Sequence, residues 1–136
     1  MKVKLDKGAY MPTRAHKTDA GLDLYSPINT TIYPDDSACI DTGVHMEIPE
    51  GYVGDIKSKS GLMVNEDIVT DGTVDCGYTG SIRVKLFNHG MTEVRIVKGQ
   101  KIAQIVIKKI ITPELELVDE LGETERGDNG FGSTGL

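Results

Sequence analysis

The sequence has no tryptophan, and aromatic residues make up only 5% of its 136 residues. A core must therefore be built from Val, Ile and Leu, although the length is sufficient for one domain with a sizeable core. Basic residues are also few, since 15 Lys and Arg against 21 Asp and Glu give a formal charge of −6. This balance argues against a general nucleic-acid or anionic-membrane binder, which needs a basic face. A small anionic ligand stays compatible if basic groups cluster locally or a cation accompanies it.

The chain also lacks long apolar runs and closely spaced cysteines. Its longest apolar run, Ile102 to Ile107, contains Gln104 and is far shorter than the roughly 20 residues of a membrane span. The first residues show no secretory hydrophobic region. Cys39 and Cys76 form no CxxC motif, so reduced thiols are expected. These features predict a soluble, cytoplasmic protein.

Apolar residues recur with a period of two, and no ten-residue stretch has a helical stripe. The alternation is seen in Val44–Ile48, Ile82–Leu86, Val94–Ile96, Ile105–Ile107 and Leu115–Leu117. Gly, Pro and Asp residues mark turns between such segments at short intervals. Many short strands with these turns predict an all-β fold of the jelly-roll, barrel or sandwich type. One short helix of at most two turns is expected at residues 60–67.

The composition changes near residue 119. Residues 119–128 read DELGETERGD and contain little that is apolar besides Leu121. Such a segment cannot bury enough surface to fold alone. We therefore predict a catalytic body spanning residues 1–118 and a flexible arm spanning residues 119–136.

Two segments could bind phosphate, and each has a plain structural explanation as well. RGDNGFGSTG (126–135) offers glycine amides, two hydroxyls and a guanidinium to phosphate oxygens. It lacks the lysine and the following helix of a P-loop, and taken alone it is better explained as a disordered tail. KSKSG (57–61) could hold phosphate at the end of a strand, or its lysines could protect an exposed edge strand from aggregation.

Three further segments contain polar side chains at unusual places. Asp75 in GTVDCGYTG (72–80) could be a carboxylate at a pocket rim or an ordinary turn residue. Asp23 lies among apolar neighbours in AGLDL, and Gln104 interrupts the apolar strand of KGQKIAQIV. A buried Gln needs hydrogen-bond partners, which the protein or a ligand could supply.

Other catalytic and metal-binding patterns are missing. His16, His45 and His89 have no metal-ligand spacing with one another or with a cysteine. The sequence has no G-x-S-x-G motif, and neither cysteine has a neighbouring histidine. It gives no support to a zinc site or to nucleophilic catalysis.

Five segments, taken in their order, resemble the five motifs of the trimeric dUTP pyrophosphatase (dUTPase) family: AGLDL, PEGYVGDIKSKSGL, GTVDCGYTG, KGQKIAQIV and RGDNGFGSTG. The likeness extends from Asp19 to the C-terminus, with compatible spacing between motifs. This resemblance implies a β jelly-roll protomer in a homotrimer whose active sites are each built from more than one chain. It also implies hydrolysis of dUTP to dUMP and pyrophosphate, assisted by Mg²⁺.

The resemblance also implies roles for individual residues. Asp75 corresponds to the aspartate that orients the attacking water and accepts its proton, and an aspartate is ionised at neutral pH. Asp23 corresponds to an aspartate that reaches Mg²⁺ through bound water. The implied substrate-binding residues are Lys59, Ser60, Gly61 and Gln104 at the phosphates, Gly72 at the uracil-reading hairpin, Tyr78 under the deoxyribose, and Arg126, Phe131, Gly132, Ser133 and Thr134 in the arm.

The chain departs from the family pattern at several places, including Met63, which stands where a small residue is frequent. Lys59 stands where an arginine is usual, so the bidentate fork is lost, and Gln100 and Lys101 stand where an Asp-Arg pair is common. Two alternatives share the scaffold: a regulatory binding protein, and a dCTP deaminase, whose expected glutamate is not evident in residues 72–80. A purely structural jelly roll would give no reason for the arm.

Overall fold

A computed structural model describes residues 1–130 of the protein. Its strands are β1 (Val3–Leu5), β2 (Gly21–Tyr25), β3 (Thr30–Ile32), β4 (Ser37–Asp41), β5 (Val44–Met46), β6 (Tyr52–Ser58), β7 (Ile68–Val69), β8 (Asp71–Val74), β9 (Arg83–Asn88), β10 (Val94–Ile96) and β11 (Lys101–Lys109). The one helix of these residues is α1 (Ser60–Glu66), so the predicted short helix is confirmed.

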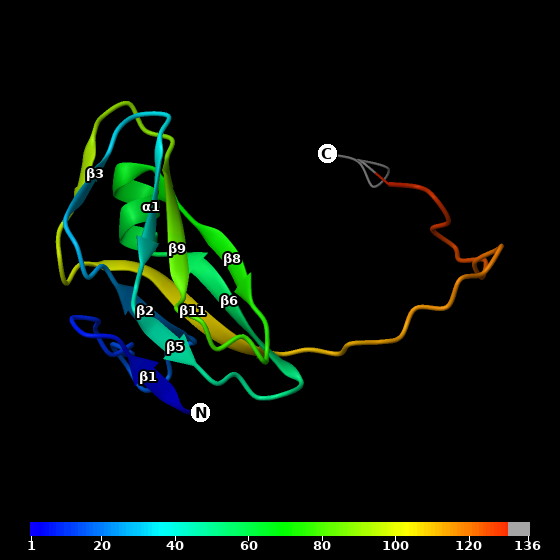
Figure 1. The fold of residues 1–136 in the computed structure, drawn as a ribbon. Helices are drawn as coiled ribbons and strands as arrows, with labels where there is room; N and C mark the ends of the chain where they lie inside the picture. Colours follow the sequence, from blue (N-terminus) through cyan, green and yellow to red (C-terminus); the bar gives the residue numbers. More distant parts are fainter. Residues whose placement is uncertain (131–136) are drawn as a thin grey trace.

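The strands form open antiparallel sheets rather than one closed barrel. The largest sheet has the order β2-β11-β6-β8, a second has the order β4-β9-β7, and the pairs β1-β5 and β10-β3 complete the body (Figure 1). Chain neighbours are seldom sheet neighbours, as expected of a jelly-roll-like topology. The predicted all-β, jelly-roll-like class is therefore confirmed.

The core consists of aliphatic side chains, as the shortage of aromatic residues requires. β9 shows the cause locally, because its residues alternate strictly between exposed and buried positions, with Val84 and Leu86 fully inside. The buried hydrophobic cluster as a whole contains only Leu, Ile, Val, Met and Ala. Gly54 of β6 leaves room in this core, because a Cβ atom there would lie 2.6 Å from Ile105 Cδ1 and 2.8 Å from Ile48 Cδ1.

Helix α1 is short for local reasons. None of its residues is buried, so no core contact extends it. It ends where Asp67 adopts a left-handed conformation with φ of 52° and its N–H bonds the carbonyl of Leu62. The helix is too short to cross a membrane, and the predicted cytoplasmic location stays a prediction.

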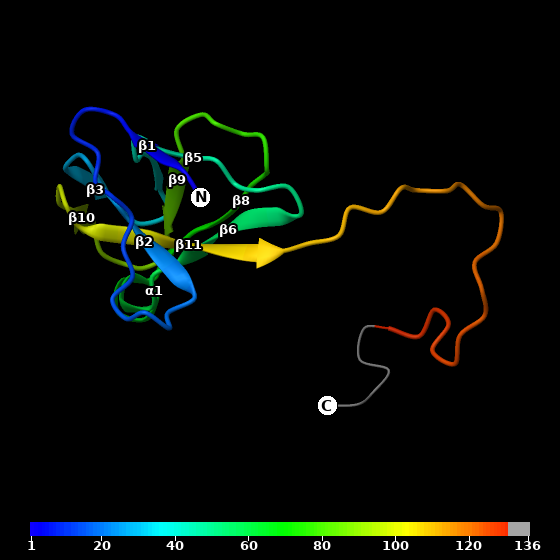
Figure 2. The same cartoon turned by 90° about the horizontal axis from the view of Figure 1, so that it is seen from below.

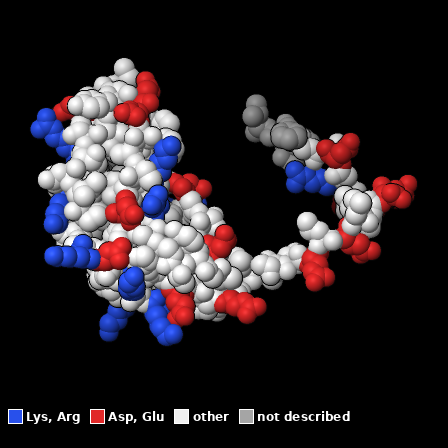
Figure 3. All heavy atoms as spheres, viewed as in Figure 1, with Lys and Arg blue, Asp and Glu red and all other residues white. Residues whose placement is uncertain are grey.

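The chain leaves the body after β11. Residues 110–130 contain no strand or helix and extend away from the sheets in both ribbon views (Figures 1 and 2). The strand predicted at Leu115–Leu117 was wrong, because no segment within residues 1–130 pairs with it, and these two side chains are 97% and 99% exposed. Acidic side chains line most of this extension (Figure 3). The body–arm boundary at residues 118 and 119 stays a prediction.

Candidate active site

A buried carboxylate bound by two lysines lies in the largest sheet. Asp23, in the middle of β2, is only 4% exposed. Its Oδ1 lies 2.7 Å from Lys59 Nζ, and its Oδ2 lies 2.8 Å from Lys101 Nζ. Lys59 directly follows β6 and Lys101 begins β11, so the sheet order β2-β11-β6 brings the three together. In the sequence, Lys101 is conspicuous only as a departure from the family pattern, and no local signal indicates its contact with Asp23.

The two lysines determine the charge state of Asp23. Burial alone would raise the pKa of the Asp23 carboxyl, but the hydrogen bonds from Lys101 and Lys59 outweigh it and lower the pKa below its ordinary value. The hydrogen bond that Lys101 donates to Asp23 also raises the pKa of Lys101. Asp23 and Lys101 are therefore both charged at neutral pH.

Gln104 lies beside this group and is held in a defined orientation. It stands opposite Asp23 in the β11–β2 register, so both side chains project from the same face of the sheet. Its Nε2 donates to the Ser58 carbonyl at 3.2 Å. Its side chain packs over Gly21, where a Cβ atom would lie 3.0 Å from Gln104 Cβ and Cδ and closer still to Oε1. Gly21 is a supporting residue that the sequence analysis missed.

The body residues that the sequence predicts to bind phosphate therefore lie together within one chain, and we call them the phosphate-binding group. Ser60 and Gly61 open helix α1 directly after Lys59, and the space beside Gly61 is open to solvent. Four of the predicted phosphate-binding residues thus gather at the junction of β6, α1 and β11: Lys59, Ser60, Gly61 and Gln104.

A second group of predicted residues lines a separate pocket. Gly72, Asp75 and Tyr78 belong to a pocket of about 290 Å³ whose wall also includes Ile56 and Ile82. Asp75 follows the end of β8 and is exposed. The turn behind it is closed by the Tyr78 N–H, which donates to the Asp75 carbonyl at 3.3 Å. The Tyr78 hydroxyl donates to the Ser81 carbonyl at 3.0 Å and fixes the ring at the pocket.

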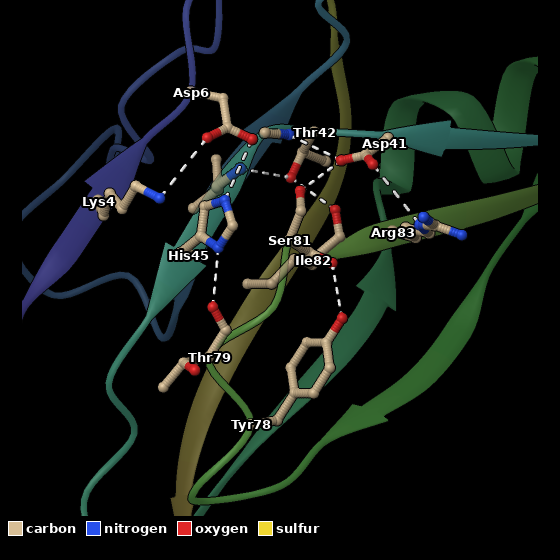
Figure 4. Close-up of polar contacts among 12 residues, drawn as sticks. Lys4, Asp6, Asp41, Thr42, His45, Tyr78, Thr79, Ser81, Ile82 and Arg83 are labelled. Carbon is tan, nitrogen blue, oxygen red and sulfur yellow. Dashed lines mark hydrogen bonds and ion pairs between the residues drawn. The ribbon is translucent and has the colours of Figure 1, made fainter.

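A polar network anchors the loop that carries Asp75 and Tyr78 (Figure 4). His45 Nδ1 lies 2.8 Å from the Thr79 carbonyl oxygen, and Nε2 lies 3.1 Å from Asp6 Oδ2. Because both ring nitrogens face acceptors, the protonated imidazolium satisfies both contacts. The Thr79 carbonyl and then the Asp6 carboxylate raise the pKa of His45.

The far side of the same loop is tied to β4. Ser81 Oγ donates to the Asp41 carboxylate, which also lies 3.5 Å from Arg83 Nε (Figure 4). The hydrogen bond from Ser81, followed by that from the Gly43 amide, lowers the pKa of Asp41. The second half of the loop is therefore fixed at Thr79 and at Ser81.

The two groups of predicted residues lie far apart within one chain. In the β6–β8 register, Lys57 pairs with Asp71 and Gly54 pairs with Val74, so Asp75 follows one end of this ladder and Ser60 follows the other. At about 3.3 Å per residue, six to seven residues separate them by roughly 20 Å. Within a single chain, Asp75 therefore does not reach the phosphate-binding group.

Comparison with known proteins decides the family. A sequence profile described as dUTPase matches residues 7–135. The chain belongs to the dUTPase family. Relatives called deoxyuridine 5'-triphosphate nucleotidohydrolase include one from Gloeothece citriformis, 44% identical over 98% of this chain and 94% of the relative. Another, from Clostridium acetobutylicum, is 42% identical over 98% of this chain and 94% of the relative.

Solved dUTPase structures share the fold over nearly the whole chain. The dUTPase of Staphylococcus bacteriophage 80alpha with dUPNHPP has a TM-score of 0.94 and 38% identity, and the match covers 99% of this chain and 98% of that one. A mutant dUTPase from phage phi11 of S. aureus has a TM-score of 0.84 and 33% identity, covering 90% and 98% of the two chains. That structure is described as showing the coordination of a structural Mg(II) ion.

Only part of the predicted arm lies within the residues that the structure describes. Arg126 is exposed, and its Nε donates to the Asn129 carbonyl at 2.8 Å within a turn of the arm. Its turn lies away from the body in both ribbon views (Figures 1 and 2). The remaining predicted arm residues fall outside the described residues: Phe131, Gly132, Ser133 and Thr134.

The described residues do not fit a Mg²⁺ site built by this dUTPase chain alone. Residues 1–130 contain no cluster of three or more His, Cys, Asp or Glu side chains that could hold a metal ion. Both oxygens of Asp23 are already paired with ammonium groups, whereas Mg²⁺ requires oxygen ligands and commonly keeps its waters and the phosphates of a substrate. The metal-directed role of Asp23 stays a prediction.

Proposed function

We propose that the protein is a dUTP diphosphatase that hydrolyses dUTP, taken as its Mg²⁺ complex, to dUMP and pyrophosphate. The family match over residues 7–135 supports this activity. The observation that carries the proposal is the presence of two parts that match a nucleotide. One is a pocket of nucleoside size at Asp75 and Tyr78, and the other is the cationic phosphate-binding group around Lys59 and Gln104. The reaction would remove dUTP and supply dUMP for thymidylate synthesis.

The proposed chemistry is an in-line attack of water on the α-phosphorus. Asp75 orients the water and accepts its proton, the new P–O bond forms, and the bond to the bridging oxygen of pyrophosphate breaks. Ser60, the Gly61 amide and Gln104 hold phosphate oxygens during this step. When bound to the triphosphate as part of the substrate, Mg²⁺ would offset the charge of the phosphates against the acidic protein.

Selectivity for a deoxyuridine nucleotide would come from the pocket of the second group. The Tyr78 ring, fixed through its hydroxyl to the Ser81 carbonyl, packs against the deoxyribose and leaves no room for a 2′-hydroxyl. Backbone groups near Gly72 read the uracil edge, and the opposite donor–acceptor pattern of cytosine is rejected there. Arg126 and the arm beyond it would then close over the terminal phosphates and the base.

We further propose a homotrimer whose sites are shared between chains. The separation of roughly 20 Å between Asp75 and the phosphate-binding group supports the homotrimer, because the α-phosphate of one substrate must contact both. The exposed leucines that precede the arm, Leu115 and Leu117, provide apolar surface to bury against another protomer. Co-refolding an Asp75→Asn chain with a Gln104→Ala chain should restore part of the activity that each lacks alone. Equal inactivity of the mixture would contradict shared sites.

Pyrophosphate release from dUTP, dCTP, dTTP and UTP with Mg²⁺ tests the activity. We expect release from dUTP alone, and ammonia release from dCTP would instead show a deaminase. Asp75→Asn should lower kcat by several powers of ten, beyond the roughly 10²–10⁴-fold of a typical general base, because positioning of the water is lost as well. Its affinity for dUPNHPP should stay close to that of the wild type. If turnover persists in this variant, Asp75 is not the base.

A regulatory role on the same scaffold is the second candidate. The solved 80alpha structures are described as phage dUTPases that control transfer of virulence genes. Such a role is compatible with catalysis, and the Asp75→Asn chain would separate the two, since it should lose hydrolysis while keeping a partner-binding surface.

A further inference from the structure

Asp23, Lys59 and Lys101 form one group, and the reaction proposed above gives Lys101 no role. Asp23 contributes one carboxylate oxygen to each lysine, at 2.7 Å to Lys59 and 2.8 Å to Lys101. The carboxylate is almost fully buried, but the Lys59 side chain is 27% exposed and the Lys101 side chain 42% exposed. The anion is thus enclosed by the sheet, while both cations reach the surface beside Gln104.

This arrangement leaves positive charge and hydrogen-bond donors of the two lysines available at the protein surface. One negative and two positive charges give the group a surplus of one positive charge. Each ammonium carries three donors and spends one on Asp23, so two remain on each lysine. A free lysine is a flexible point charge, and anchoring it beforehand removes much of the entropy lost when it binds an anion. The group is therefore prepared for a ligand with several anionic oxygens.

We propose that Asp23 is a positioning residue that holds Lys59 and Lys101 as a fixed pair of cations for the triphosphate, which makes Lys101 a further phosphate-binding residue. The inference rests on the proposed function, because the triphosphate comes from it. Arginine is usual at both positions in the family pattern, so two anchored point charges stand here in place of two guanidiniums. A water-mediated role of Asp23 toward Mg²⁺ would need a third cation beside two ammoniums that already occupy its oxygens.

Binding of dUPNHPP and of dUMP by calorimetry, at saturating Mg²⁺, tests the pair. Lys101→Met should weaken dUPNHPP binding about 10-fold or more, as expected for loss of a charged hydrogen bond, with a smaller effect on dUMP. Lys101→Arg should retain most of the affinity. The matched control is Lys108→Met, which removes a lysine from the same strand that pairs with Asp55, and it should stay within about twofold of the wild type.

Asp23→Asn distinguishes positioning from plain attraction. Removing the negative charge should tighten binding of a triphosphate if only net charge matters, whereas loss of positioning should weaken it. Weakening that higher Mg²⁺ fully reverses would instead assign Asp23 to the metal and overturn the proposal. Should this variant fail to fold, as a melting curve would show, Lys101→Met still decides, since its side chain is largely at the surface.

The two levels of the proposal fail separately. If wild-type protein binds dUPNHPP through Lys101 but releases no pyrophosphate from dUTP, the proposed activity is refuted and the cation pair is not. If dUTP is hydrolysed normally and Lys101→Met binds dUPNHPP as tightly as the wild type, the cation pair is refuted alone.

Discussion

Gly21→Ala tests whether Gln104 is held where the site needs it. Gly21 opens β2 in an ordinary extended conformation, so its backbone accepts alanine. The added methyl, however, would overlap Gln104 Oε1 and lie 3.0 Å from both Cβ and Cδ of that side chain. The glutamine must then rotate away from Gly21 and give up its hydrogen bond to the Ser58 carbonyl.

The expected cost to stability is modest. Overpacking costs about 1–3 kcal/mol and the lost hydrogen bond about 0.5–1.5 kcal/mol, offset by about 0.5–1 kcal/mol from the lower backbone entropy of alanine. The free energy of unfolding should fall by about 1–3 kcal/mol, which lowers Tm by roughly 3–10 °C. Calorimetry or circular dichroism measures this directly.

The expected cost to activity is larger. A hydrogen bond to a charged group is worth about 1.5–3 kcal/mol, so displacing Gln104 from a phosphate oxygen should lower kcat/KM about 10- to 150-fold. Pyrophosphate release over a range of dUTP concentrations gives this value. Unchanged kcat/KM in a variant with lowered Tm would refute the phosphate-binding role of Gln104.

A double mutant shows whether the effect passes through Gln104. Gln104→Ala removes the atoms that collide most, leaving a Cβ–Cβ distance of 3.0 Å that a shift of a few tenths of an ångström relieves. Gly21→Ala should therefore add little to Gln104→Ala, whereas independent sites would give additive losses. Additive losses in kcat/KM would place the action of Gly21 elsewhere.

Three further outcomes are expected. Because its folded-state pKa is raised, protonated His45 stabilises the loop at Thr79 fully below the unfolded pKa of about 6.5, and this stability is lost as the pH rises through the folded pKa. Tm measured against pH should therefore fall over this range less steeply in His45→Gln than in the wild type, and superimposable profiles would contradict the assignment. Deleting Arg126–Leu136 should leave Tm nearly unchanged but lower kcat/KM sharply; near-normal turnover in the truncated chain would exclude the arm from the site. Gly54→Ala should lower the free energy of unfolding by about 1–3 kcal/mol in chemical denaturation, because the methyl meets Ile105 in a packed core, and an unchanged midpoint would show that the core yields there.

Local patterns in the sequence were sufficient for the fold class and for the short helix. Period-two alternation reports which side of a strand is buried, and β9 follows it without exception. The same alternation misled at Leu115–Leu117, because a strand also needs a partner to satisfy its backbone, and the period of side chains says nothing about partners.

The residues of the candidate site could be named from the sequence, but their arrangement could not. Order and type of the motif residues marked Asp23, Lys59 and Gln104, and Asp23 and Gln104 are also conspicuous as polar groups among apolar neighbours. The contact of Lys101 with Asp23 depends on β11 pairing with β2 and on a register irregularity between Lys101 and Ala103. Such long-range register leaves no local signature, and for the same reason the distance between Asp75 and the phosphate-binding group could not be read from spacing.

The covalent attachment of the arm sets how tightly it must bind. About 16 residues join Ile110 to Arg126, so a coil of this length has a root-mean-square span of roughly 20–25 Å and can reach at most about 55 Å. Such a tether presents Arg126 to a site within that range at an effective concentration on the order of millimolar. The proposed closure over a bound nucleotide would then require only weak intrinsic affinity, and weak affinity would allow fast reopening for product release. The arm supplied as a separate peptide to a truncated enzyme should accordingly be needed at millimolar concentration.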